Sequence, residues 1–395
     1  MASAHHPAGV YLDYAATTPV RTEVRDAMLP YLGDEHFGNP SSGHSHGRAA
    51  RAALDDARRR IAEALRCDPV QVIFTSGGTE ADNLAVLGAA LRARSRGRPF
   101  RVAVGATEHK AVLDAAHAVE RLGGEAMVLP VDGNGRVEAA AVDRALARDP
   151  AVLSVMWVNN ETGAIQDVHA LADRASASGT PFHSDAVQAV GKIPCRVDGT
   201  AIALLAISGH KIGAPKGIGA LIVREPDLLE PLIHGGGQQH GIRPGTENVA
   251  GAVGLGLAVE LAVREREVVM PRLGALRDRL EAILLSVLPE AAVTGAGGER
   301  APHIANLTLP GVDSGALLVH LDQAGIQCST GSACSTGRAE PSHVLTAMGL
   351  PPERARSPLR FSLSSRSTEA EIGHVGARMP EIVARVRVLS EALGW

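Results

Sequence analysis

Between about residues 70 and 225 the chain alternates short apolar runs with longer segments of helical character. The run "VIFT" is followed by "SGGTEADNLAVLGAALRAR", and "RVAVGA" is followed by "TEHKAVLDAAHAVERLGG". The apolar runs are short and rich in Val, Ile and Leu, which is typical of buried strands. Strands that alternate with helices in this way predict βαβ units and a mostly parallel, doubly wound sheet. The predicted fold class is therefore α/β.

The pattern changes after the glycine-rich stretch "HGGGQQHGIRPGTENVAG". A long helix is predicted over about residues 252–287, followed by strand-like "HIANLTL", "GIQCST" and "PLRFSLS" with a helical "SGALLVHLDQ" among them. A chain of 395 residues is also too long for one ordinary hydrophobic core. We predict a large domain over residues 15–262 and a smaller α+β domain formed by residues 1–14 and 263–395.

Composition excludes several classes of function. Hydrophobic residues make up 45% of the chain and charged residues 21%, as in a soluble globular protein. With a net charge of −4, no basic block and only 3% aromatic residues, nucleic acid is not expected as a direct ligand. No apolar run approaches the length of about 18 residues that a membrane span requires. The first residues lack the pattern of a signal peptide, so we expect a cytoplasmic protein without a membrane partner.

The four cysteines are too few and too scattered for a disulfide framework. No C-x-x-C pair occurs, so no metal site is predicted. Cys334 lies in "STGSACSTG", where small residues predict a loop over about residues 325–340 and an ionised thiol would be a nucleophile. The alternative for Cys334 is a small buried hydrophobic residue. Cys328 is interpreted as a packed strand residue, or as a second thiol that receives sulfur, whereas Cys67 and Cys195 are interpreted as structural.

Polar residues follow nearly every predicted strand of the first half. They are Ser76–Thr79, Glu108–His109, Asn159–Glu161, Asp185 with Gln188, and Ser208–Lys211. In open α/β sheets, ligands bind outside the carboxyl ends of the strands. We therefore predict that these five groups form one site at one edge of the sheet.

Lys211 is the most informative residue of this set. It lies in "SGHKIGAPKG" between the apolar runs "AIALLAI" and "IGALIV", and a lysine close to the interior is costly unless it is paired or chemically used. The alternative is a lysine in a tight surface turn. Pyridoxal phosphate (PLP) requires a lysine for a Schiff base, an anion site for its phosphate and an acid for its pyridine nitrogen. Lys211, the Ser76–Thr79 turn and Asp185 meet those three requirements, and Ser208 and His210 would add phosphate donors.

Each of these residues also has a purely structural interpretation. The "TSGGTEADN" segment is either an anion site at a helix start or a simple helix cap, and it matches neither the ATP-binding nor the NAD-binding glycine motif. Asp185 and His109 would each serve as a helix cap. Arg360 in "LRFSLS" would hold a substrate carboxylate or form a structural ion pair.

Taken together, the motifs resemble those of the cysteine desulfurases, PLP enzymes of fold type I in the class V aminotransferase superfamily. The resemblance covers nearly the whole chain and implies a large domain with a seven-stranded sheet. The loop after Cys334 has the longer form of the branch that serves nitrogen fixation and iron–sulfur assembly. The motifs that carry the resemblance are "FGNPSSGHSHGR", "TSGGTEADN", "TEHKAV", "VNNETG", "SDAVQAVGK", "SGHKIGAPKG", "HGGGQQHGIRPGT" and "GSACSTGRAEPSHVL".

The resemblance also implies roles for individual residues. Lys211 carries PLP, and His109 stacks on the ring and moves protons at the substrate. Cys334 takes sulfur from L-cysteine as a persulfide, and L-alanine is released. The other implied roles are pairing with the pyridine nitrogen (Asp185), contact with the ring oxygen or substrate (Gln188 and Asn160), phosphate binding (Gly78, Thr79, Ser208, His210 and, from the second subunit, Thr246) and binding of the substrate carboxylate (Asn39 and Arg360).

The partners implied are L-cysteine, a sulfur-acceptor protein such as an iron–sulfur scaffold or a thiolation enzyme, and a second copy of the chain. One alternative is a selenocysteine lyase or another class V PLP enzyme, which would not require a thiol at Cys334. Another is a sulfur carrier or scaffold that has lost catalysis. The presence of Lys211, Asp185 and His109 argues against that second alternative.

Overall fold

The computed structural model describes residues 9–331 and 341–392, and its larger part is built on a seven-stranded sheet. Strand β8 runs antiparallel to both of its neighbours, and every other neighbouring pair is parallel. The α/β prediction with a mostly parallel sheet is confirmed. In spatial order the strands are β2 (Val72–Thr75), β8 (Gly219–Val223), β7 (Ile202–Ser208), β6 (Phe182–Asp185), β5 (Leu153–Ser154), β3 (Arg101–Gly105) and β4 (Glu125–Leu129).

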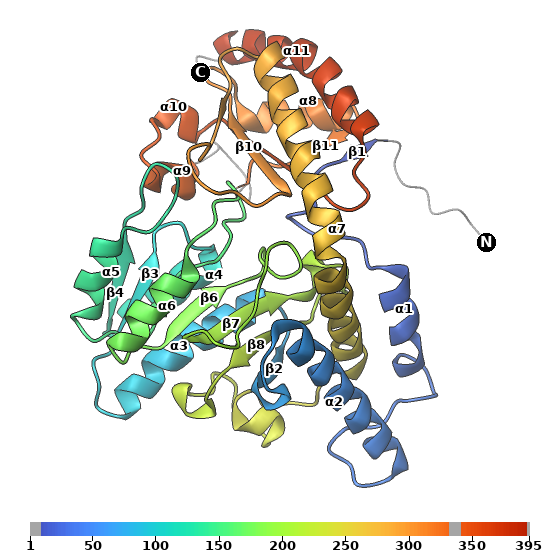
Figure 1. The fold of residues 1–395 in the computed structure, drawn as a ribbon, viewed down its shortest axis with the longest axis vertical. Helices are drawn as coiled ribbons and strands as arrows, with labels where there is room; N and C mark the ends of the chain where they lie inside the picture. The colour runs from blue at the N-terminus through green and yellow to red at the C-terminus, as the bar shows by residue number, and fades with distance from the viewer. Residues whose placement is uncertain (1–8, 332–340, 393–395) are drawn as a thin grey trace.

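Helices cover both faces of this sheet (Figure 1). On one face, α3 (Gly78–Ser95) and α4 (Lys110–Arg121) pack against side chains such as Val104 and Leu204. On the other face, side chains such as Phe182 and Leu205 belong to a core to which α1 (Thr22–Met28) contributes Val24 and to which four longer helices also contribute. These helices are α2 (Ser45–Leu65), α5 (Ala139–Leu146), α6 (Val168–Ala177) and the first half of α7 (Val249–Val287).

The smaller part has its own hydrophobic core, which includes Leu280, Leu307 and Phe361. It contains an antiparallel sheet in the order β12-β10-β9 and a parallel pair that joins the N-terminal β1 to β11. Its elements are β1 (Val10–Tyr11), β9 (Ala292–Val293), β10 (Ile304–Thr308), α8 (Ser314–Gln323), β11 (Ile326–Gln327), β12 (Pro358–Ser362) and α11 (Glu369–Ala392). The short helices are α1 (Thr22–Met28), α9 (His343–Ala347) and α10 (Pro352–Ala355).

Helix α7 passes from one core into the other, since its first half packs in the larger core and its second half in the smaller. The domain bounds of residues 15–262 for the larger part and 1–14 with 263–395 for the smaller stay a prediction, and Ala301 packs in the core of the larger part. No helix among the described residues is long and apolar enough to span a membrane.

Two predicted strands are shorter than expected. In "AVLSVMWV" only Leu153–Ser154 forms a strand, and in "GIQCST" only Ile326–Gln327 does. Beyond Ser154 the chain still follows β6, because the N–H groups of Val155 and Trp157 donate to the carbonyls of His183 and Asp185. The strand ends early because its pairing with β3 stops at Ser154. The chain that continues past it carries Met156 and Asn160 into the wall of the site.

Candidate active site

A cavity of about 410 Å³ lies where the parallel strands end, between the larger and the smaller part. The segment around Ala15 and Ala16 forms one wall, and Ser329 and Gly331 approach from the smaller part. Ten predicted site residues line it, which confirms that the strand ends share one edge: Gly78, Thr79, His109, Asn160, Asp185, Gln188, Ser208, His210, Lys211 and Arg360.

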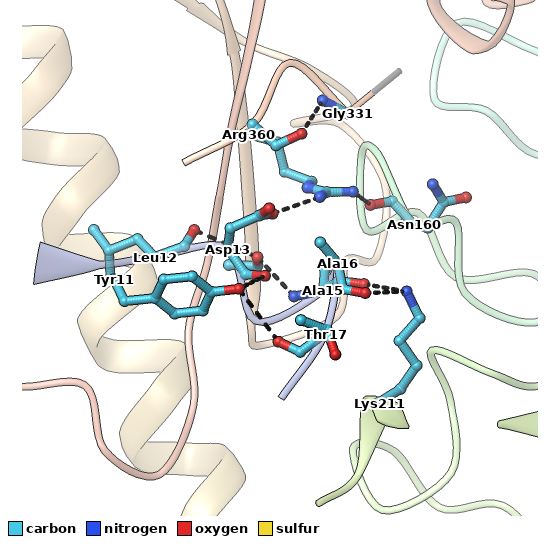
Figure 2. A network of polar contacts seen from close by, with 12 residues as sticks. Tyr11, Leu12, Asp13, Ala15, Ala16, Thr17, Asn160, Lys211, Gly331 and Arg360 are labelled. Atoms are coloured by element: carbon cyan, nitrogen blue, oxygen red, sulfur yellow. Dashed lines mark hydrogen bonds and ion pairs between the residues drawn. The ribbon is translucent and has the colours of Figure 1, made fainter. Parts of the chain in front are cut away.

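Lys211 enters this cavity from the short helical turn that follows β7. Its Nζ donates to the carbonyl oxygens of Ala15, at 2.7 Å, and Ala16, at 2.8 Å (Figure 2). Burial lowers the pKa of Lys211 to about 8, and the nearby Arg360 guanidinium acts in the same direction. A larger share of this amine is therefore neutral at physiological pH than of an ordinary lysine, as a nucleophilic amine requires.

Asp185 ends β6 and is buried beneath the same cavity. Its Oδ1 accepts a hydrogen bond of 2.8 Å from the N–H of Val187. Burial raises the pKa of Asp185, while that hydrogen bond and the charges of His109 and Lys211 counteract the rise. A carboxyl group in such surroundings is stabilised in its ionised form by a cation placed within the cavity.

The start of α3 faces the cavity, where Gly78 and Thr79 line it next to Ser208 and His210. The first N–H groups of a helix are free to bind an anion. A Cβ atom on Gly78 would lie 2.9 Å from Cγ2 of Val187, so the absence of a side chain lets the helix start approach this wall. Burial, helped by the neighbouring lysines, lowers the pKa of His210 to about 4, so this ring is a neutral hydrogen-bonding group.

His109 caps α4, and its Nδ1 accepts a hydrogen bond of 3.1 Å from the N–H of Ala111. Because Nδ1 is an acceptor, the neutral ring carries its proton on Nε2. The ring lines the cavity, so His109 combines the predicted cap with a group that can exchange a proton there.

Arg360, from β12, supplies a buried guanidinium to the cavity, with only 4% of its side chain exposed. Its Nη1 donates to the carbonyl oxygen of Asn160 at 2.8 Å, and its Nη2 donates to Oδ1 of Asp13 at 2.6 Å (Figure 2). Its Nε has no hydrogen-bond partner among the described residues. Arg360 therefore forms an ion pair and still has N–H groups for a substrate carboxylate, so the two interpretations of this residue are compatible.

Two predicted site residues are not brought into this cavity, and a third lies outside the described residues. Asn39 and Thr246 are exposed and do not line it, and the side chain of Asn39 instead accepts a hydrogen bond from Ser41. Thr246 was expected to act from a second subunit. Cys334 lies outside the described residues, and Gly331, three positions earlier in the chain, lines the cavity. The roles of all three stay predictions.

The other cysteines lie in apolar surroundings. Cys328 packs against the core of the smaller part, and burial raises the pKa of its thiol, which makes it a poor nucleophile. Burial also raises the thiol pKa values of Cys67 and Cys195 to about 12. These surroundings favour the packed-residue interpretation of Cys328.

Sequence reasoning missed Asp13 and Lys192. Asp13 pairs with Arg360 across 347 positions of the chain, a contact that no local pattern reveals. Lys192 Nζ lies 3.3 Å from Oε1 of Gln188, and burial lowers the pKa of this lysine to about 7. Its place in "AVGKIP", among apolar residues, was the available signal. Lys192 lines a second cavity of about 130 Å³, which we call the rear cavity.

Known proteins match this chain along nearly its whole length. The sequence profile of class-V aminotransferases matches residues 10–375. The cysteine desulfurase IscS of Dictyoglomus turgidum is 42% identical over 381 residues, which is 96% of each chain. The chain belongs to the cysteine desulfurase family.

Solved structures that match this chain have the same fold. A NifS-like protein superposes with a TM-score of 0.88 at 32% identity, and the match covers 95% of this chain and 100% of the other. SspA in complex with cysteine superposes with a TM-score of 0.79 at 33% identity, covering 91% of this chain and 100% of the other. Both likenesses confirm the predicted PLP fold type I architecture.

Proposed function

We propose that this protein is a PLP-dependent cysteine desulfurase, which removes sulfur from L-cysteine to give L-alanine and a persulfide on Cys334. The observation that carries this proposal is the convergence, in one cavity, of the Lys211 amine, the buried carboxyl of Asp185, a helix N-terminus and the Arg360 guanidinium. Membership of the desulfurase family supports it, as does the cysteine bound by the similar protein SspA.

The donor set of the cavity fits PLP. The free N–H groups at the start of α3, with Ser208 and His210 beside them, suit a phosphate, and Gly78 has no side chain to fill that place. Asp185 is a buried acid suited to a protonated pyridine nitrogen, and Lys211 is an amine of lowered pKa. When bound, PLP supplies an electron sink for negative charge at the substrate Cα.

Lys211 has two tasks in this proposal. As a neutral amine it binds the cofactor, and as a base it takes a proton from the substrate Cα. The carbonyl oxygens of Ala15 and Ala16 hold its ammonium form when the amine is free. Because a positive charge is otherwise poorly solvated at this depth, these two acceptors keep the free lysine in place.

Arg360 orients the substrate through its carboxylate. The guanidinium is itself fixed by the Asn160 carbonyl and by Asp13, so little rotamer freedom is lost when a carboxylate binds. His109 presents a ring proton on Nε2 and is placed to pass protons to and from the substrate.

The sulfur step is assigned to Cys334. Its thiolate attacks the substrate sulfur, forming an S–S bond while the Cβ–S bond breaks. The electron pair of the broken bond stays on Cβ, which takes a proton and becomes the methyl group of alanine. The persulfide then passes to a sulfur-acceptor protein, for which an iron–sulfur scaffold or a thiolation enzyme remains the expectation.

We also propose a homodimer. Thr246, which the family resemblance assigns to the phosphate site of a second subunit, is exposed and does not line the cavity of its own chain, which supports this proposal.

The test is to incubate the purified protein with L-cysteine and a thiol reductant and to quantify alanine and sulfide together. The wild type and Cys328→Ser should each form alanine and sulfide in equal amounts. Cys334→Ser should form neither product. Pyruvate in place of alanine, or activity that survives the loss of Cys334, would indicate a different PLP chemistry on the same fold.

A further inference from the structure

A carboxylate outside the active-site cavity holds the turn that presents Gly78 and Thr79. Glu80 lies in the first turn of α3, and its Oε2 accepts a hydrogen bond of 2.7 Å from the N–H of Ser76. This bond closes the chain around the helix start, in the way that an acid at the third helical position commonly does. Gly78 and Thr79 line the cavity, whereas Ser76 and Glu80 do not. Glu80 therefore acts on the helix start from outside the cavity.

The same carboxylate is paired with Arg243. Arg243 Nε donates to Glu80 Oε1 at 2.8 Å, and Arg243 Nη2 lies 3.4 Å from Glu80 Oε2. The side chains of Arg243 and Glu80 are 23% and 19% exposed, so the pair is partly shielded from solvent. Burial alone would raise the pKa of Glu80, but the hydrogen bonds from Arg243 and Ser76 lower it, so this carboxyl group is ionised at neutral pH.

An ionised carboxylate at this position has two opposite effects on an anion site. Its negative charge stabilises the helix start, which is the positive end of the helix dipole. Without a partner, the same charge would repel a phosphate bound at that end of the helix. The Arg243 guanidinium compensates the charge of Glu80. The hydrogen bond to Ser76 is thereby kept, while the repulsion is largely cancelled.

The segment that carries Arg243 is attached to the edge of the large sheet through Gln239. Strand β2 is the edge strand, and the N–H of Phe74 donates to Gln239 Oε1 at 3.3 Å. Gln239 Nε2 in turn donates to the carbonyl oxygen of Phe74 at 3.1 Å. Arg58 Nη2 also donates to Gln239 Oε1, at 2.8 Å. The amide therefore takes the place of a neighbouring strand along one residue of β2.

The backbone at this attachment point is strained. Gln239 and His240 have φ values of 52° and 59°, in the left-handed region that residues other than glycine rarely adopt. Such residues persist where the surrounding structure determines their conformation, as the buried and fully paired amide of Gln239 does here. A few positions later the chain presents Arg243 to Glu80. The strained turn therefore sets where the guanidinium lies.

We propose that Glu80 and Arg243 are positioning residues of the phosphate site, and that Arg243 keeps this site favourable for a phosphate group by compensating the charge of Glu80. The inference rests on the proposed PLP site and goes beyond it, because a charged pair outside the cavity sets the shape and the electrostatic potential of the helix start. Both residues act through the backbone of residues 76–79, and neither lines the cavity.

The test compares the binding of PLP with that of pyridoxal, which lacks the phosphate, by absorbance titration of the cofactor-free protein. Arg243→Met leaves Glu80 without its partner and should raise the Kd for PLP about tenfold, because an uncompensated charge then lies near the phosphate. The Kd for pyridoxal should stay close to the wild-type value. Arg243→Lys keeps the positive charge and should restore most of the affinity for PLP.

A double variant separates the effect of charge from a general loss of structure. Adding Glu80→Gln to Arg243→Met removes the uncompensated charge and keeps an oxygen that can accept from Ser76, so PLP should bind more tightly than to Arg243→Met alone. Arg174→Met, which breaks an exposed ion pair with Asp143, is the matched control and should change neither Kd. Equal weakening of PLP and pyridoxal binding, or a double variant that binds PLP less tightly than Arg243→Met, would overturn the proposal.

Inorganic phosphate gives a readout that does not depend on PLP. Its binding to the cofactor-free protein can be followed by ³¹P NMR, and the variants should rank in the same order as with PLP. A wild type that binds phosphate, with this order among the variants, but fails to bind PLP would overturn the proposed function and support the role of the pair. A wild type that binds PLP, with equal phosphate affinity in the wild type and Arg243→Met, would overturn the role of the pair and leave the proposed function intact.

Discussion

The segment Tyr14–Thr18 lies between two cavities that both contain a lysine of lowered pKa. The active-site cavity holds Lys211, and the rear cavity is lined by Lys192 and also by the other side of Lys211. In the first, the amine lies with Asp185, Arg360 and the start of α3. In the second, Lys192 lies with His303 and apolar side chains such as Met270 and Leu273. Lysine burial is common to both regions. The active-site cavity adds the buried carboxyl of Asp185 and the start of α3, whereas the carboxylate that lines the rear cavity, Glu265, is paired with Arg21.

The difference teaches that a lowered lysine pKa does not by itself define a PLP site. Lys192 has the lower pKa of the two, about 7 against about 8 for Lys211. Its Nζ faces the side-chain oxygen of Gln188, an uncharged partner. The convergence of unlike groups at the ends of several strands is what gives the active-site cavity its chemistry.

The largest effect is expected from Lys211→Met. Loss of both the cofactor-binding amine and the proton-transfer group should lower alanine formation by at least about 10²–10⁴-fold. The assay is alanine release from L-cysteine at equal protein concentration. Near wild-type activity of Lys211→Met would contradict the distinction between a catalytic Lys211 and a non-catalytic Lys192.

Arg360→Lys should have the next largest effect. Lysine keeps the positive charge but loses the planar fork that binds a carboxylate with two hydrogen bonds. With a charge-assisted hydrogen bond contributing about 1.5–3 kcal/mol, kcat/KM for L-cysteine should fall about 10–100-fold, mostly through KM. An unchanged kcat/KM of Arg360→Lys would show that Arg360 acts only as a structural ion pair.

Asp13→Asn should weaken the same wall of the cavity more mildly. Removing the partner of a buried guanidinium typically costs about 1–3 kcal/mol, and Asp13 is 20% exposed, so the lower end is expected. Urea unfolding of the cofactor-free protein measures this cost, and a rise in KM should accompany it. Asp26→Asn, which alters an exposed ion pair with Arg25, is the matched control and should change neither quantity.

The smallest effect on activity is expected from Lys192→Met, which should stay within a few-fold of the wild type. Its effect on stability should depend on pH. Because the folded pKa of about 7 lies below the usual value of about 10.4, the unfolded state binds more protons between these two values. The wild type should therefore gain stability relative to Lys192→Met as the pH rises from 7 toward 10. A constant difference across that range would mean that Lys192 titrates normally in the folded protein.

Much of the active-site cavity could be predicted from the sequence because its residues follow strands. The alternation of strands and helices places Asp185, Ser208 and Lys211 at one edge, whatever the details of packing. Asp13 could not be predicted, because its role depends on the approach of β1 and β12 across almost the whole chain.

The predicted roles of three site residues rest on the family resemblance alone. Asn39 and Thr246 do not line the cavity of the single chain, the family resemblance assigns Thr246 to a second subunit, and Cys334 lies outside the described residues. The resemblance to a family supplied these three assignments, and no strand end or helix cap in a single chain would have done so.

The most direct test of the central claim is to reduce the PLP-loaded protein with borohydride and to locate the pyridoxyl group by peptide mass spectrometry. Attachment at Lys211 is predicted, because Asp185, the helix start and Arg360 lie in the cavity that its amine enters. Attachment at Lys192, or no stable attachment at any lysine, would contradict the assignment of the active site to this cavity.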